Sequence, residues 1–165
     1  MQTTFAGIDA EYHQNTHGCF CKKAISHDIH TQPSEASMAD MSKHTILVVE
    51  DEWMVAEDIR SSLSEHGYNT CVATSGHEAI AAAERCAPTL ILMDVHLKGS
   101  MLGTEAAQKI RETLGTPVVY LTAHADQSTI ETAQATEPVA FLIKPIKMNA
   151  LLEQVDQAIN SLTNT

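Results

Sequence analysis

Acidic side chains directly follow two of the apolar runs in this chain. Glu50, Asp51 and Glu52 come after "ILVV", and Asp94 comes after "LILM". Carboxylates gathered in one place raise each other's pKa unless a cation lies between them. Oxygen ligands of this kind suit Mg²⁺, which usually binds one or two carboxylates together with a phosphate. These residue types therefore indicate a metal site for phosphoryl chemistry, in which an aspartate can attack phosphorus.

Two more polar residues follow apolar runs further along the chain. Thr122 follows "VVYL", and Lys144 follows "AFLI". A hydroxyl and an amine are suitable partners for the oxygens of a phosphoryl group. Whether these side chains meet the carboxylates depends on the elements that carry them.

Short apolar runs alternate with helical patterns from residue 45 onward. The runs are "TILVV", "TCVA", "TLILM", "PVVYL" and "VAFLI", and the helical patterns span residues 53–66, 76–86, 104–114, 126–136 and 148–162. Strands that alternate with helices predict right-handed crossovers and a parallel sheet covered on both faces, a doubly wound α/β fold. Ligands of such sheets bind at the carboxyl ends of the strands. We therefore expect the acidic, hydroxyl and amine groups to converge at one edge.

From about Lys43 to the C-terminus, the chain resembles the receiver domain of two-component response regulators. The matching pieces are "ILVVEDE", "LILMDVHLKG", "VVYLTAH" and "AFLIKP", in this order along the chain. The resemblance implies a flavodoxin-like (βα)5 sheet with strand order 2-1-3-4-5. It also implies a signalling switch rather than an enzyme with turnover.

The resemblance assigns roles to the acidic residues. It implies that Asp94 is the phosphoacceptor. It further implies that Mg²⁺ is held by Glu50, Asp51, Asp94 and the backbone carbonyl of His96. An acidic pair after a strand can also simply favour the positive end of a helix dipole, and a strand-terminal aspartate can cap a helix.

Three residues of the last two apolar runs also have a counterpart in the family. The resemblance implies that Thr122 donates a hydrogen bond to the phosphoryl group and that Lys144 neutralises another of its oxygens. Phe141 matches the aromatic switch position, although plain core packing is an alternative role. The proline after Lys144 matches a family proline that is often preceded by a cis bond.

Two histidines stand two residues beyond key positions, His96 after Asp94 and His124 after Thr122. In receiver domains these positions flank the route of water to the phosphoryl group. An imidazole there can orient water when neutral or pair with phosphoryl oxygens when charged. We therefore expect the two histidines to tune phosphoryl lifetime, with solvated surface histidines as the alternative.

The family implies a histidine kinase or histidine phosphotransfer protein as phosphoryl donor, and an unknown downstream protein as output. A phosphatase or phosphotransferase with a transient aspartyl phosphate is the alternative, but such enzymes of the haloacid dehalogenase type place an aspartate where this chain has His96. A nucleotide or flavin binder would need a glycine-rich loop after the first strand, which "EDEWM" does not supply.

Composition sets the remaining expectations. A net charge of -11 argues against direct nucleic-acid binding, and the sequence has neither a membrane-length apolar run nor a recognisable signal peptide, which predicts a cytoplasmic protein. Residues 1–42 lack periodicity and are expected to form a disordered extension, and 43–165 a stand-alone receiver domain. The four cysteines are expected to be thiols, with Cys71 and Cys86 as small core or near-surface residues.

Overall fold

The computed structural model describes residues 41–123 and 127–163. Its five strands are β1 (Thr45–Val49), β2 (Asn69–Ala73), β3 (Leu90–Asp94), β4 (Val118–Thr122) and β5 (Ala140–Ile143). Its helices are α2 (Trp53–Glu65), α3 (Gly76–Cys86), α4 (Gly103–Leu114), α5 (Gln127–Gln134) and α6 (Met148–Thr163). All pairs are parallel, and the strand order is β2-β1-β3-β4-β5. The predicted fold and strand order are therefore confirmed.

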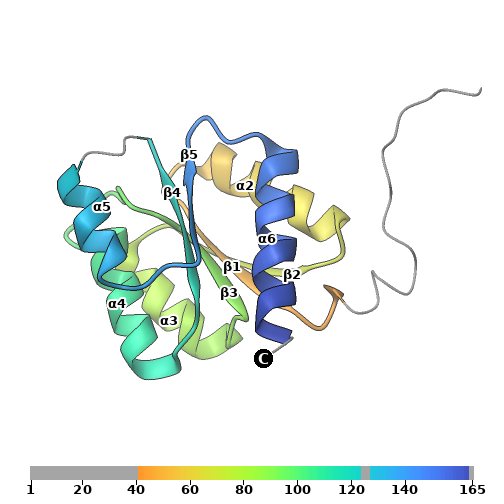
Figure 1. The fold of residues 1–165 in the computed structure, drawn as a ribbon, viewed down its shortest axis with the longest axis horizontal. Helices are drawn as coiled ribbons and strands as arrows, with labels where there is room; N and C mark the ends of the chain where they lie inside the picture. Colours follow the sequence, from red (N-terminus) through yellow and green to blue (C-terminus); the bar gives the residue numbers. More distant parts are fainter. Residues whose placement is uncertain (1–40, 124–126, 164–165) are drawn as a thin grey trace, which may run out of the picture. The chain divides into compact units, whose positions relative to one another are not determined.

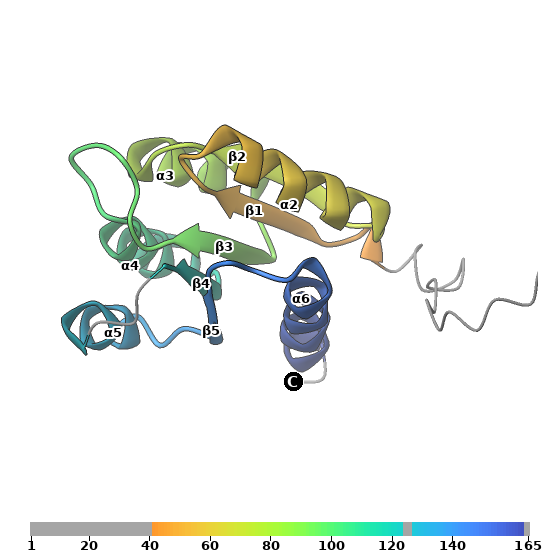
Figure 2. The ribbon, with the colours of Figure 1, turned by 90° about the horizontal axis from the view of Figure 1, so that it is seen from above.

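Helices cover both faces of this sheet, as Figure 1 and Figure 2 show. Helices α3, α4 and α5 pack on one face, and α2 and α6 pack on the other. Side chains of the central strands alternate between the two cores: Leu47 and Val49 face the first, and Ile46 and Val48 the second. A strand that is buried on both faces needs apolar residues throughout, which explains the unbroken aliphatic runs.

Local sequence signals explain where the helices begin and end. The Ser75 hydroxyl accepts a hydrogen bond from the backbone N–H of Glu78 at the start of α3. Helix α4 ends at Leu114 and is followed by Gly115, whose φ of 68° is left-handed and suits glycine. Helix α5 is shorter than its predicted span of residues 126–136 because Pro138 and the left-handed Glu137 follow it.

The cysteine expectation is wrong for one pair. Cys71 of β2 and Cys86 at the end of α3 are joined by a disulfide. The spacing of the four cysteines did not predict this bond, because the pairing depends on how α3 packs back along the edge strand β2. The bond ties the C-terminal end of α3 to the sheet.

Two contacts mark the start of the described chain. Met41 packs against the core that α2 and α6 cover, and the Asn69 side-chain amide donates to the Ser42 carbonyl at 2.6 Å. Residues 1–40 lie outside the described residues, so the proposed division into an extension and a receiver domain stays a prediction. Among the described residues, no helix is both long and apolar enough to cross a bilayer.

Candidate functional site

The strand order brings the predicted site residues to one edge of the sheet. Glu50 follows β1, Asp94 ends β3, and Thr122 ends β4. The backbone N–H of Lys144, which follows β5, donates to the Thr122 carbonyl at 2.8 Å. Since β1, β3, β4 and β5 are neighbours in this parallel sheet, their carboxyl ends lie side by side.

The ammonium group of Lys144 lies between two of the carboxylates. Its Nζ donates to Glu50 Oε2 and to Asp94 Oδ2, each at 2.6 Å. The Glu50 side chain is 1% exposed and that of Asp94 is 8% exposed, whereas Lys144 retains 21% exposure. A solvated surface lysine would make neither contact, so the lysine is part of the acidic site.

The pKa values of Glu50 and Lys144 are both raised at this site, which disfavours the charged form of Glu50 and favours the charged form of Lys144. Removal from water raises the pKa of the Glu50 carboxyl, and its hydrogen bond to Lys144 only partly offsets that cost. Burial lowers the pKa of Lys144, but its hydrogen bonds to Asp94 and Glu50 outweigh burial and raise that pKa above its ordinary value. The lysine therefore stays protonated at neutral pH.

Oxygen atoms of three carboxylates lie close together at this edge of the sheet. One oxygen each of Glu50, Asp51 and Asp94 lies within 4.8 Å of the other two, the only such grouping of His, Cys, Asp and Glu side chains among residues 41–123 and 127–163. A hard oxygen donor set fits Mg²⁺. The expected acidic cluster is thus present, with Asp51 as its most accessible described member at 11% exposure.

A lysine that the sequence did not single out contacts this cluster. Lys98, in the loop between β3 and α4, places its Nζ 2.7 Å from Asp51 Oδ2. Lys98 belongs to the "LKG" motif, but its side chain could not be assigned a direction before the path of the loop was known.

Three other predicted residues take clear positions. Thr122 is buried at 2% exposure. The His96 side chain is exposed, while its backbone N–H donates to Asp94 Oδ1 at 2.9 Å. Phe141 stacks on Tyr120 with ring centroids 5.6 Å apart. The peptide bond between Lys144 and the next proline is cis, as the motif indicated.

His124 lies outside the described residues, and the lifetime-tuning role of both histidines stays a prediction.

A glycine that no sequence motif singled out lies against the proposed phosphoacceptor. A Cβ atom at Gly103, the first residue of α4, would lie 1.9 Å from the Asp94 carbonyl oxygen. The Gly103 N–H also donates to the Val95 carbonyl at 3.1 Å. Any larger residue would push α4 away from the end of β3. The glycine just before the predicted helix 104–114 was the available signal.

Known proteins share the sequence features of this region. A family model described as the response regulator receiver domain matches residues 46–156. The transcriptional regulatory protein PdtaR of Mycobacterium tuberculosis is 32% identical over 116 residues, which cover 70% of this chain and 56% of PdtaR. The DNA-binding response regulator MtrA of the same species is 33% identical over 118 residues, covering 70% of this chain and 50% of MtrA. The chain thus spans about half the length of the curated relatives it matches.

Solved structures share its fold. The signal receiver domain of a modulated diguanylate cyclase from Desulfovibrio desulfuricans G20 aligns with a TM-score of 0.67 and 28% identity, over 72% of this chain and 94% of that one. A CheY-like receiver domain protein from Methanospirillum hungatei JF-1 aligns with a TM-score of 0.70 over 73% of this chain and 97% of that one. At 24% identity, the second match supports the fold alone.

Proposed function

The chain belongs to the response regulator receiver family, and on that premise we propose that it accepts a phosphoryl group on Asp94 from a histidine kinase or a histidine phosphotransfer protein. The observation that carries the proposal is the Lys144 ammonium group, held 2.6 Å from both Asp94 and Glu50. A lysine in this position can neutralise charge that arrives on Asp94.

The transfer needs little covalent chemistry from the protein. A carboxylate oxygen of Asp94 attacks phosphorus, the P–N bond to the donor histidine breaks, and its electron pair stays on the departing imidazole. Water later attacks the phosphorus of the acyl phosphate, which releases inorganic phosphate and restores the Asp94 carboxylate. Lys144 would meet the added negative charge, and the hydroxyl of Thr122, the last residue of the neighbouring strand β4, would donate to a phosphoryl oxygen.

Glu50, Asp51 and Asp94 would hold Mg²⁺, together with the backbone carbonyl of His96. When bound, this ion neutralises charge on the phosphoryl oxygens. The three carboxylates have the donor chemistry for it. The protein's own contribution is to keep those oxygens converged at the strand ends.

Phosphorylation would act as a switch for an unknown downstream protein. The new negative charge on Asp94 would attract the Thr122 hydroxyl and the Lys144 ammonium group, and would thereby change the packing of β5. Phe141 is the aromatic residue that would report this change, because it lies on β5 and stacks on the buried Tyr120. Phosphorylation changes the affinity for a partner only if the partner binds one arrangement of β5 better than the other.

We propose no turnover enzyme and no direct nucleic-acid binding for this chain. Where a phosphatase of the aspartyl-phosphate type would need a second acid, this chain has the exposed His96. MtrA is a DNA-binding response regulator, but the chain spans only half of its length. With a net charge of -11, the chain would be repelled by phosphate backbones. The cytoplasmic location stays a prediction.

Incubation with acetyl phosphate and Mg²⁺ distinguishes the switch from the enzyme. Intact-mass spectrometry of a switch shows one added phosphoryl group per chain, which then decays after the donor is removed. A phosphatase would instead consume many equivalents of acetyl phosphate while little phosphoprotein accumulates. The second result would refute the switch proposal.

A further inference from the structure

We infer that Lys98 is a built-in counter-cation of the acidic site, which holds Asp51 in the metal-free protein and must release it before a divalent cation binds there. The inference rests on the proposed function, because it concerns the same metal site. It adds a residue that sets the metal affinity of this particular chain.

The contact that carries the inference is direct. Lys98 Nζ and Asp51 Oδ2 are 2.7 Å apart, a charge-assisted hydrogen bond. This bond, reinforced by the charges of Glu52 and Glu50, raises the pKa of Lys98 above its ordinary value. The ammonium group therefore occupies one of the two carboxylate oxygens of Asp51, a proposed metal ligand.

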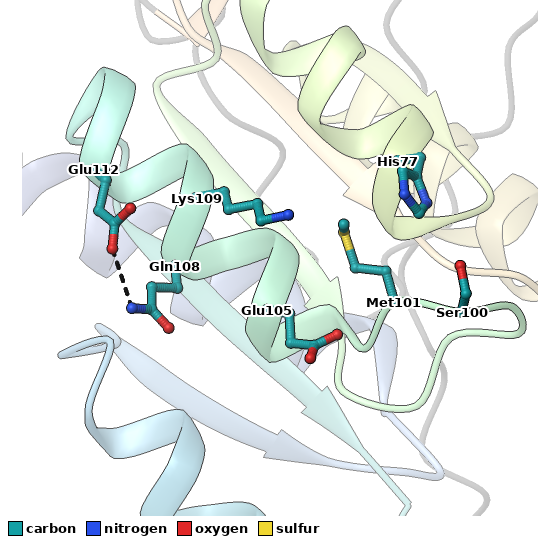
Figure 3. A pocket seen from close by; sticks show the side chains of 7 residues that line it. All are labelled: His77, Ser100, Met101, Glu105, Gln108, Lys109 and Glu112. Atoms are coloured by element: carbon teal, nitrogen blue, oxygen red, sulfur yellow. Dashed lines mark hydrogen bonds between the residues drawn. The ribbon is translucent and has the colours of Figure 1, made fainter.

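The loop that carries Lys98 is anchored on both sides of it. Leu97 and Met101 are 6% and 8% exposed and belong to the core between the sheet, α3 and α4. Figure 3 shows the Met101 side chain between these helices, and Ser100 and His77, which are both exposed, line the same pocket. Between the two buried anchors, Gly99 turns the chain with a φ of 120°. The backbone at Lys98 is thus held near the acidic cluster, while its long side chain is 82% exposed and has Asp51 as its ion-pair partner.

The charges of the site indicate which lysine must leave. Three carboxylates face two ammonium groups, because Lys144 pairs with Glu50 and Asp94 and Lys98 pairs with Asp51. A dication added to this set would make the local charge positive, and its repulsion of a nearby ammonium group is strong at contact distance. Lys144 is only 21% exposed and makes two contacts, whereas Lys98 is 82% exposed and makes one. Lys98 is therefore the group that can swing into solvent.

This arrangement gives Lys98 a defined role in the metal-free state. Its positive charge offsets the repulsion that the neighbouring carboxylates exert on Asp51. The same contact competes with the metal, so the metal-free state is stabilised and the apparent affinity for Mg²⁺ is lowered.

The test is a Mg²⁺ titration followed by the backbone amide resonances of Glu52 and Val95, which flank the carboxylates. We expect Lys98→Gln to lower the Kd for Mg²⁺ by about two- to fivefold, the range of exposed ion pairs. Lys98→Arg keeps the positive charge, so its Kd for Mg²⁺ should equal that of the wild type. Lys109→Gln is the matched control, because Lys109 is an exposed lysine of α4 and its loss changes net charge equally.

Equal Kd values for Lys98→Gln and the wild type would overturn the inference while leaving the metal site intact. So would tighter binding by Lys98→Arg, since charge would then not be the cause, or equal tightening by Lys109→Gln, since net charge alone would then suffice. If Mg²⁺ shifts no amide in any variant, the metal site fails, and the inference fails with it.

Discussion

Gly103 lies so close to Asp94 that a Cβ atom on the glycine would be 1.9 Å from the aspartate's carbonyl oxygen. The contact sets the N-terminus of α4 against the end of β3, directly beside the proposed phosphoacceptor. Asp94 ends β3 and Gly103 begins α4, and these two elements pack in the same core.

We therefore expect Gly103→Ala to destabilise the domain by about 3 kcal/mol, the upper range for overpacking. Urea denaturation measures this change. Gly115→Ala is the matched control, because a Cβ there meets nothing within 4 Å and only the left-handed φ of 68° disfavours alanine. Similar losses in both variants would mean that the close approach to Asp94 is not the cause.

Most of the fold and the convergence of the acidic, hydroxyl and amine residues at one edge of the sheet could be predicted from the sequence, for one physical reason. A strand that is buried on both faces must be aliphatic, so the aliphatic runs of β1 and β3 predicted these strands. The residues that follow parallel strands lie at one edge of the sheet, which predicted where the polar side chains converge. The direction in which each side chain points could not be predicted from the sequence. Lys98, Gly103 and the pairing of Cys71 with Cys86 depend on how loops and helices return over the sheet, which periodicity does not encode.

Replacing the buried Glu50 by glutamine should stabilise the metal-free protein at neutral pH. Because burial raises the pKa of Glu50 above its ordinary value of 4.5, ionised Glu50 costs stability once pH exceeds the folded pKa. Glutamine avoids that cost and can still accept from Lys144. In thermal denaturation we expect Glu50→Gln to raise Tm by roughly 2–6 °C at pH ~7.5, a change of about 1 kcal/mol.

The same variant should gain nothing at pH ~4, where both Glu50 carboxyl and glutamine are neutral. Glu84→Gln, an exposed glutamate of α3, controls for the loss of one negative charge. A Glu50→Gln gain that is equal at both pH values, or that Glu84→Gln reproduces, would contradict the burial argument.

The disulfide should stabilise the purified, oxidised protein. Cys71 and Cys86 are 15 residues apart, and closing a loop of that length is worth about 3 kcal/mol in the unfolded-chain entropy model. Dithiothreitol should therefore lower Tm in the wild type and leave a Cys71→Ala, Cys86→Ala double variant unchanged. An unaltered wild-type Tm after reduction, verified by thiol counting, would show that the bond contributes little.

Trp53 should report metal binding. It is the first residue of α2, lies two residues beyond Asp51 and is 64% exposed, so its fluorescence is sensitive to charge and solvent at the acidic cluster. We expect millimolar Mg²⁺ to change the emission of the wild type and to have a much smaller effect on Asp51→Asn. The same response in both proteins would separate the signal from the proposed metal ligands.

Asp94 is the proposed phosphoacceptor, and the contact of Lys144 Nζ with its Oδ2 at 2.6 Å supports that role. The most direct measurement is peptide-level mass spectrometry after incubation with acetyl phosphate and Mg²⁺, on the wild type and on Asp94→Asn. We predict one phosphoryl group on the wild-type peptide that contains Asp94, and none on the variant. Equal labelling of Asp94→Asn, or a label mapped to another peptide, would contradict the assignment.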